Sequence, residues 1–385
     1  MLNHNLRGVG TFYRCWHLAK ELVRSGHEVL VFTVSPDRRV LPRVSIQDGL
    51  TIVETPNLLD LVNGLGTSYG VLGIPLRMLV AARRRADVIH AFDHKPNVFL
   101  PAMLARAFSG SPLVVDWADW WGFAPDGSGI EEWRGWPVTH LENVMEESIH
   151  KRADQVTTIS TGLRDRALSL GIPSSKVRWI PSGAPIESIQ PLDKLRCKEE
   201  LGLPPSTFLI GFVGSGANDL DLVMPALTLL RRERPTIRLG LVGTSPRFTG
   251  VLGSESREMT ISFGPIPFTR LPTYLGACDA FVLPLRDNVY NRTRWPNKFG
   301  DYLAAGRPVL CSDVGDVADI VRSRNCGFVW GDPTDFVVAV ETLVDDEALM
   351  AEMGGRAREV AETRLSWPKL ASEFLEVYRH AGAQG

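Results

Sequence analysis

The chain has 385 residues, of which 44% are hydrophobic and 22% are charged. This balance is typical of a soluble globular protein, and the length suits two domains rather than one. The formal net charge of -2 disfavours a nucleic acid partner, which calls for a strongly basic surface. No apolar run approaches the roughly 20 residues of a membrane-spanning helix, and the polar first residues do not predict a signal peptide.

Five cysteines are scattered along the chain without a Cys-x-x-Cys pair. They are Cys15, Cys197, Cys278, Cys311 and Cys326. An odd number of isolated cysteines predicts reduced, buried thiols in a cytoplasmic protein, and no pattern here points to a metal site. A catalytic cysteine is the alternative, but a role in the core is favoured.

Strand and helix patterns alternate along the first half of the chain. Residues 11–24 show helical spacing of apolar side chains, which Gly26 ends. Short β-branched runs then predict strands at residues 28–34, 87–92, 112–116, 155–160 and 177–181. This alternation is typical of a parallel sheet with helices on both faces.

The same alternation begins again in the second half. Strands are predicted at residues 208–214, 238–243, 260–264, 280–283 and 308–311. Residues 182–198 contain two prolines, Pro185 and Pro191, and no clear period, so we place the linker there. The expected architecture is α/β, with two doubly wound, Rossmann-like domains and a ligand cleft where the carboxyl ends of their strands face each other.

The N-terminus departs from this architecture. A doubly wound domain begins with a buried strand, and residues 1–6 (MLNHNL) are too polar to predict a full one. The glycine turn 7–10 (RGVG) and its helix follow at once. Two explanations stay open: a reading frame assigned a late start, or a vestigial first strand. The late start is favoured, because an inner strand is costly to lose.

The most informative segment is residues 291–314, NRTRWPNKFGDYLAAGRPVLCSDV. Pro296 and Asn297 suit the start of a helix, whose N-terminus binds anions such as a diphosphate. Lys298 adds a positive charge there, with Arg292 and Arg294 just before it. Asp301, one turn further on, can accept hydrogen bonds from two ribose hydroxyls. A solvated helix start with ordinary surface charges is the alternative, and spacing alone hardly separates the two.

This segment resembles the donor-binding motif of retaining GT-B glycosyltransferases, family four in particular. DYLAAG matches that family's "EAMAAG" or "EYLAAG", with Asp301 in its second acidic position. The first acidic position falls on Thr293, a departure that leaves the donor sugar open. The resemblance implies that Asp301 holds the ribose and that Asn297 and Lys298, in a Pro-x-Lys variant of the motif, hold the phosphates.

The resemblance extends over almost the whole chain. RGVG, with Gly8 and Gly10, resembles the family's glycine loop, and RADQVTTIS and IPSGAP resemble signatures that end the first domain. FGPIPFTRLPTYLGACDAFVLPL resembles the segment that cradles the nucleotide base, which implies contacts from Pro265 and Ile266. The family's closing helix crosses back, so we expect residues 1–185 with 370–385 to form the acceptor-side domain and 186–369 the donor domain.

Two loops depart from the family pattern. The loop after the first strand of the donor domain begins Gly214-Ser215 and lacks the usual Arg and Lys, so its amides, Lys298 and one of the preceding arginines must hold the diphosphate. If none reaches it, the site is inactive. After the strand at 112–116, Asp119 follows the position where many relatives have His. It contacts the sugar or acceptor, or it has a structural role.

Two segments suggest an acceptor or membrane surface. Half of the ten tryptophans lie at Trp117, Trp120, Trp121, Trp133 and Trp136. They suit sugar stacking or a membrane interface, although a small packed cluster is the favoured alternative. Residues 72–85 (LGIPLRMLVAARRR) suit an anionic membrane surface, and an ordinary amphipathic helix with solvated arginines is again favoured.

The resemblance implies a retaining hexosyltransferase that uses a nucleotide-sugar and no metal or other cofactor. Its expected acceptor is a glycan or lipid-linked glycan of cell-envelope polysaccharide or glycolipid synthesis. Its expected place is the cytoplasm, with peripheral contact at the inner membrane face and no nucleic acid partner. Two alternatives stay open: a sugar-nucleotide epimerase, which needs no acceptor, and a catalytically impaired relative that only binds a nucleotide-sugar.

Overall fold

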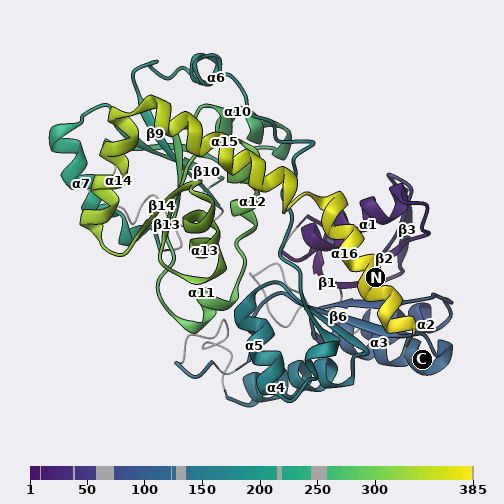
Figure 1. Ribbon diagram of the computed structural model, residues 1–385. Helices are drawn as coiled ribbons and strands as arrows, with labels where there is room; N and C mark the ends of the chain where they lie inside the picture. Colours follow the sequence, from purple (N-terminus) through teal and green to yellow (C-terminus); the bar gives the residue numbers. More distant parts are fainter. Residues whose placement is uncertain are drawn as a thin grey trace. The chain divides into compact units, whose positions relative to one another are not determined.

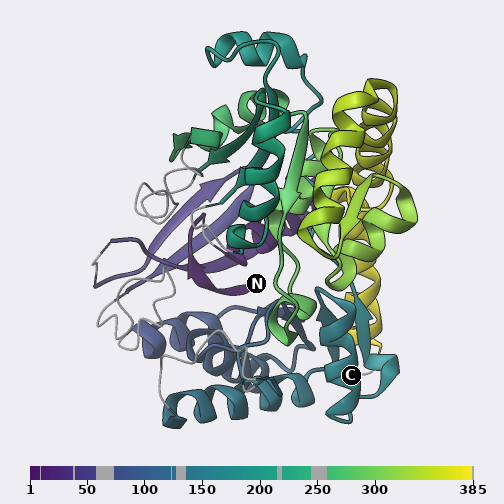
Figure 2. The same ribbon diagram turned by 90° about the vertical axis from the view of Figure 1, so that its left-hand side faces the viewer.

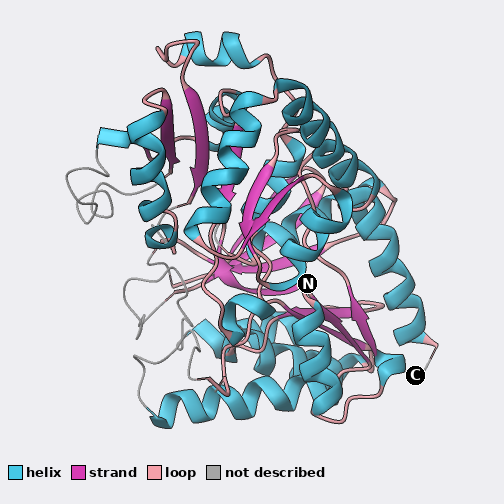
Figure 3. Ribbon diagram, turned by 60° about the vertical axis from the view of Figure 1, so that its left-hand side comes forward, coloured by secondary structure: helices cyan, strands magenta, loops and turns pink. Residues whose placement is uncertain are grey.

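The computed structural model describes residues 1–8, 10–37, 40–57, 73–122, 124–126, 136–214, 219–243 and 258–383, without the side chains of 136–139. The chain divides into two compact units. The first contains Met1–Ser182, Asn288–Arg294 and Trp367–Gly385, and the second contains Gly183–Asp287 and Trp295–Ser366. Each unit holds a sheet of mostly parallel strands flanked by helices, which confirms the predicted fold class (Figures 1 and 3).

The sheet of the first unit has eight strands in the order β3-β4-β2-β1-β5-β6-β7-β8. These are β1 Leu2–Leu6, β2 Leu30–Val34, β3 Arg43–Gln47, β4 Leu50–Thr55, β5 Ile89–Phe92, β6 Leu113–Trp117, β7 Gln155–Thr158 and β8 Val177–Trp179. Every pair is parallel except β3 with β4, a hairpin at one edge that the sequence pattern did not predict.

Helices of the first unit flank this sheet (Figure 2), whereas the short α11 packs on α5. They are α1 Phe12–Arg24, α2 Ile74–Ala82, α3 Pro96–Ser109, α4 Trp136–Arg152, α5 Thr161–Ser169, α11 Val289–Thr293 and α16 Trp367–Gly382, with a 3-10 turn, η3, at Ser174–Lys176. One core joins α1, α16 and the sheet, through buried side chains such as Leu18, Phe374 and Ile52. Burial of this apolar surface holds the closing helix on the first unit.

The expectation that residues 1–6 cannot form a full inner strand is wrong. Strand β1 pairs with β2 and β5 in the middle of the sheet, and Leu2 to Asn5 are buried. Its two asparagines have local partners: Asn3 Nδ2 donates to Thr11 Oγ1 at 3.0 Å, and that hydroxyl donates to Asn5 Oδ1 at 2.6 Å. Buried polar groups with such partners lose little on folding, so polarity alone did not exclude a strand.

The second unit has six parallel strands in the order β11-β10-β9-β12-β13-β14. These are β9 Phe208–Val213, β10 Ile237–Val242, β11 Thr260–Gly264, β12 Ala280–Leu283, β13 Val309–Ser312 and β14 Gly327–Trp330. Its helices are α6 Lys194–Glu200, α7 Met224–Glu233, α10 Leu271–Gly276, α12 Asn297–Ala304, α13 Gly315–Arg324, α14 Pro333–Asp345 and α15 Glu347–Thr363, with turns η4 Leu220–Leu222 and η5 Phe268–Arg270. Helix α6 begins inside the segment predicted as linker.

Candidate functional site

Helix α12 carries the polar motif and is fixed at the carboxyl end of β9. The Tyr302 hydroxyl accepts a hydrogen bond from the backbone N–H of Val213 at 2.9 Å. The Tyr302 ring stacks on Phe281 of β12, with centroids 4.2 Å apart. A Cβ on Gly300 would lie 2.7 Å from the carbonyl oxygen of Gly183, so this position has room for glycine alone. These contacts set the helix at the sheet edge where α/β proteins bind ligands.

The start of α12 combines a helix N-terminus with a lysine. The helix begins at Asn297, which is exposed, directly after Pro296. The Lys298 ammonium lies 3.8 Å from the centroid of the Phe212 ring, near the end of β9. Because helix N-termini carry partial positive charge, this end attracts anions. Its residues have the chemistry needed to hold a diphosphate.

Asp301 lies one turn into the same helix. Its carboxylate is half-buried and makes no hydrogen bond or salt bridge with any residue that the structure describes. Burial raises the pKa of Asp301 to about 7, against the opposing effect of Lys298. A carboxylate with unfilled acceptor positions beside an anion site can bind a pair of hydroxyls.

Glycine turns follow the three neighbouring strands β9, β10 and β11. The N–H of Gly214 donates to the carbonyl of Val242 at 2.9 Å, and the N–H of Gly243 donates to the carbonyl of Gly264 at 2.8 Å. Gly243 and Gly264 have φ of 82° and 65°, which favours glycine. Pro265 is exposed and Ile266 half-buried directly beyond these turns. The structure thus brings the expected base-contacting residues to the edge that holds Lys298, while Ser215 lies outside the described residues.

Arg286 is a basic residue at this edge that the sequence analysis missed. It follows β12, and its guanidinium lies 3.6 Å from Asp219 Oδ1 and 2.5 Å from Asp221 Oδ2. Its backbone N–H also donates to Asp219 at 3.1 Å. The acidic charge of the loop after β9 is therefore balanced by an arginine from the next strand. The signal was its place in LPLR, three residues past a strand end.

The residues just before α12 belong to the first unit. Helix α11 carries Arg292, which is exposed, and Thr293, which is 4% exposed. The Thr293 hydroxyl bonds to the carbonyl of Val289 at 2.9 Å, and its own carbonyl accepts from Ser160 Oγ at 2.5 Å. The Arg294 guanidinium lies 5.0 Å over the Tyr290 ring. The structure does not group these three residues with Lys298 and Asp301 in one unit.

The glycine loop after β1 has a backbone that requires glycine. Gly8 and Gly10 are exposed, with φ of 80° and 56°. A Cβ on Gly10 would lie 2.7 Å from Asn5 Nδ2, which is held in the polar cluster of β1. The loop therefore turns tightly at the carboxyl edge of the first sheet, as expected for a ligand-binding loop.

Asp119 lies in the loop after β6, among tryptophans that face inward. Trp117 is completely buried and stacks on His150, and Trp121 is 8% exposed. Trp120 is half-buried under the guanidinium of Arg166, at 3.8 Å. These three residues form the small packed cluster that was the favoured alternative. Trp133 and the side chain of Trp136 lie outside the described part.

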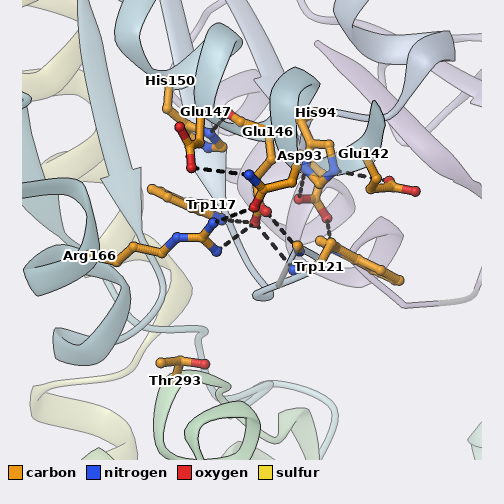
Figure 4. A network of polar contacts seen from close by, with 12 residues as sticks. Asp93, His94, Trp117, Trp121, Glu142, Glu146, Glu147, His150, Arg166 and Thr293 are labelled. Carbon is orange, nitrogen blue, oxygen red and sulfur yellow. Dashed lines mark hydrogen bonds and ion pairs between the residues drawn. The ribbon is translucent and has the colours of Figure 1, made fainter. Parts of the chain in front are cut away.

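Ion pairs and hydrogen bonds join the loops after β5 and β6 to α4 (Figure 4). His94 Nε2 lies 3.0 Å from Glu142 and its Nδ1 lies 3.4 Å from Asp93. These two carboxylates raise the pKa of His94 to about 9, although burial opposes the charge. Lys95 also pairs with Glu142 and lies 3.5 Å from the centroid of the Trp121 ring. This buried network stabilises the carboxyl edge of the first sheet.

Within residues 72–85 the structure has helix α2, Ile74–Ala82, and Leu72 lies outside the described residues. Arg77 is 1% exposed and donates to the carbonyls of Asn3 and Phe32, so it is not one of the solvated arginines expected there. The arginines at 83–85 are exposed. Within the described residues no helix is long and apolar enough to cross a membrane. The same residues contain no cluster of three His, Cys, Asp or Glu side chains suited to a metal ion.

Two family models match adjoining parts of the chain. The "Glycosyl transferase 4-like domain" matches residues 9–183, and "Glycosyl transferases group 1" matches residues 207–346. D-inositol 3-phosphate glycosyltransferase 1 of Catenulispora acidiphila is 24% identical over 94% of this chain and 88% of its own length. The putative teichuronic acid biosynthesis glycosyltransferase TuaH of Bacillus subtilis is 25% identical over 73% of this chain and 70% of its own.

Solved structures share the fold over nearly the whole chain. Sucrose-phosphate synthase from Thermosynechococcus elongatus has a TM-score of 0.79 at 18% identity, covering 99% of this chain and 95% of that one. HepE from Anabaena has a TM-score of 0.73 at 15% identity, covering 98% of both chains. With both sheets, both family models and these relatives in agreement, the chain belongs to the group 1 glycosyltransferases of the GT-B fold.

Proposed function

We propose that this glycosyltransferase moves a hexose from a nucleoside diphosphate-sugar to a hydroxyl of a glycan or lipid-linked glycan, with retention at the anomeric carbon. The observation that carries the proposal is the start of α12, where Lys298 stands at a helix N-terminus and Asp301 offers an unfilled carboxylate one turn away. The first suits the diphosphate and the second suits the ribose.

The relatives support this choice of substrates. HepE was crystallised with UDP and with UDP-glucose. The relatives are named for D-inositol 3-phosphate in one case and, as a putative enzyme, for teichuronic acid biosynthesis in the other. We take from them a nucleotide-sugar donor and a hydroxyl-bearing acceptor used in polysaccharide or glycolipid synthesis.

In the proposed reaction the bond between the anomeric carbon and the diphosphate breaks. Lys298 and the amides of α12 stabilise the charge that develops on the departing diphosphate. The acceptor hydroxyl bonds to the anomeric carbon on the same face, and its proton passes to the leaving phosphate oxygen. Asp119 accepts a hydrogen bond from the acceptor hydroxyl and orients it. Because fixed cations and amides stabilise the diphosphate, the proposed transfer uses no metal.

A catalytically impaired relative is the second candidate. It is favoured by the absence of a basic residue from positions 214–218 and by Thr293, whose hydroxyl bonds to its own helix. Such a protein would bind a nucleotide-sugar without releasing the nucleotide. An epimerase would consume the donor with no acceptor present.

A panel of nucleotide-sugars separates these functions. We expect one donor to raise the melting temperature of the wild-type protein and to release nucleoside diphosphate only when an acceptor glycan is added. Asp301→Ala removes the ribose contact, so it should weaken donor binding by about tenfold or more, as for loss of a charged hydrogen bond. Asp313→Ala, an exposed carboxylate of the same unit that pairs with Arg322, is the matched control. If no donor shifts the melting temperature, both the transferase and the binding protein are excluded.

Donor binding should depend on pH near neutrality. Burial raises the pKa of Asp301 to about 7, and only the ionised carboxylate accepts two hydroxyl hydrogen bonds. Acidification therefore protonates the group that binding requires, and affinity should fall by up to about tenfold per pH unit below this pKa. Titration calorimetry with a nucleotide-sugar from pH 6 to 8, values chosen to lie about one unit on either side, measures this. Asp301→Asn should bind more weakly with a flat profile; an equal slope in both proteins would contradict the assignment.

A further inference from the structure

The loop of residues 117–122 leaves the carboxyl end of β6 and carries Asp119 near its middle. Asp119 is half-buried and makes no hydrogen bond or salt bridge with any residue that the structure describes. Trp117 and Trp121, on either side of it, are buried. The position of the Asp119 carboxylate therefore depends on the contacts that fix the loop at Trp117 and Trp121.

Glu146 of α4 holds both ends of this loop (Figure 4). It is completely buried. Its Oε1 accepts the indole N–H of Trp117 at 2.8 Å and the backbone N–H of Trp121 at 3.2 Å. Its Oε2 accepts the backbone N–H of Gly122 at 2.9 Å. One carboxylate thus bonds to the residue that begins the loop and to the two that end it.

Arg166 of α5 supplies the opposite charge. Its guanidinium lies 3.3 Å from Glu146 Oε1, and its side chain is 5% exposed. The same guanidinium lies over the ring of Trp120 at 3.8 Å and over that of Trp117 at 4.9 Å. The ring of Trp120, directly after Asp119, is therefore fixed by the partner of Glu146.

The end of the loop packs directly on α4. A Cβ at Gly122 would lie 2.2 Å from Asn143 Oδ1 and 2.7 Å from Glu146 Oε2, which leaves no room for another side chain. The Trp121 indole N–H donates to Asp93 Oδ2 at 3.0 Å, a second anchor from the neighbouring β5 loop. With these contacts the loop backbone has little freedom on either side of Asp119.

We propose that Glu146 is a positioning residue, which holds the 117–122 loop so that Asp119 meets the acceptor hydroxyl. This inference rests on the proposed transferase function. Removing a carboxylate from water costs several kcal/mol, which its hydrogen bonds and ion pairs must offset. Well-packed apolar side chains at a buried position often give a protein equal stability. Unlike an apolar side chain, the Glu146 carboxylate also accepts hydrogen bonds from three donors of one loop. A catalytic group needs such a supporting contact to keep its geometry.

Glu146 also acts on Asp119 through its charge. Burial is the main cause that raises the pKa of Asp119 to about 7. Asp93 and Glu146 raise it further, whereas Arg294 and Lys95 lower it. Removing the Glu146 charge should therefore lower this pKa, and any activity that needs the Asp119 carboxylate should begin at lower pH.

Three variants test the proposal. Glu146→Gln keeps the shape of the side chain but replaces one accepting oxygen by an amide NH2 group. That group then faces an N–H donor, either that of Gly122 or those of Trp117 and Trp121. Glu146→Ala removes every bond. Glu147→Gln is the matched control, because Glu147 bonds only to Asn143 and Lys151 among the contacts resolved for it. We expect kcat to fall about tenfold in Glu146→Gln and about a hundredfold in Glu146→Ala, as for a misplaced catalytic group. The donor KM should stay within about twofold, since the donor residues lie in the other unit.

The readouts separate positioning from simple loss of fold. The pH profile of kcat should move to lower pH in Glu146→Gln and stay in place in Glu147→Gln. A carbon NMR titration of the Asp119 carboxyl group, assigned with Asp119→Asn, should show the same shift without any turnover. If Glu146→Gln changes only the melting temperature, with kcat and the titration unchanged, the proposal is overturned. If wild type transfers no sugar while the titration shifts, the proposed function fails and the Glu146 contact stands.

Discussion

Replacing Lys298 by alanine is expected to lower turnover by roughly a hundred- to a thousandfold, the loss seen when a preorganised group that stabilises transition-state charge is removed. The Lys298 ammonium lies over the Phe212 ring at the start of α12. It is positioned where negative charge develops as the diphosphate departs. Donor affinity should fall less than kcat, because the charge grows toward the transition state.

Single-turnover release of nucleoside diphosphate, measured beside donor affinity, checks this. Lys298→Arg keeps the charge without the compact ammonium, so an intermediate rate is expected. Lys194→Ala is the control within the same unit, since Lys194 of α6 pairs at 2.7 Å with Asp279, which directly precedes β12. Equal rates for Lys298→Ala and wild type would show that another residue stabilises the departing diphosphate, and Arg286 would be the next residue to test.

The fold was predictable because its strands carry dense apolar side chains. Ten predicted strands are present, with ends shifted by at most two residues. Strand β1 was not predicted, because its polar side chains are held by hydrogen bonds among Asn3, Asn5 and Thr11, which no sequence periodicity reveals. The β3–β4 hairpin also escaped notice: Val44 and Ile46 of β3 are exposed, so no buried face marks it.

The donor end of the site was predictable because its residues follow one another within a single turn of helix. Lys298 and Asp301 share one short motif, and the structure keeps them together in α12. The acceptor side was not, since its contacts join residues far apart in sequence. Glu146 lies 24 to 29 residues from its three loop donors, and a lone glutamate on a helix is typical of a solvated surface. Arg286 and Asp219, 67 residues apart, escaped for the same reason.

The largest effect on stability is expected from Asp116→Ala, which should destabilise the first unit by about 3–5 kcal/mol. Arg14 and Asp116 are both buried and form two hydrogen bonds, at 2.7 Å and 2.9 Å. Arg14 also donates to the carbonyls of Ile180 and Pro181, and so joins α1 to β6 and to the end of β8. Without Asp116 the guanidinium stays buried with half of its partners, and an uncompensated buried charge is among the costliest defects in a protein.

Urea unfolding followed by tryptophan fluorescence measures this loss. Arg164→Ala is the control, because Arg164 and Asp165 form an exposed pair that should contribute less than about 1 kcal/mol. The double variant Arg14→Met with Asp116→Ala removes the stranded charge and should recover part of the loss. It should not recover all of it, because the carbonyls of Ile180 and Pro181 lose their donor. A double variant no more stable than Asp116→Ala alone would show that packing, rather than charge, makes this position sensitive.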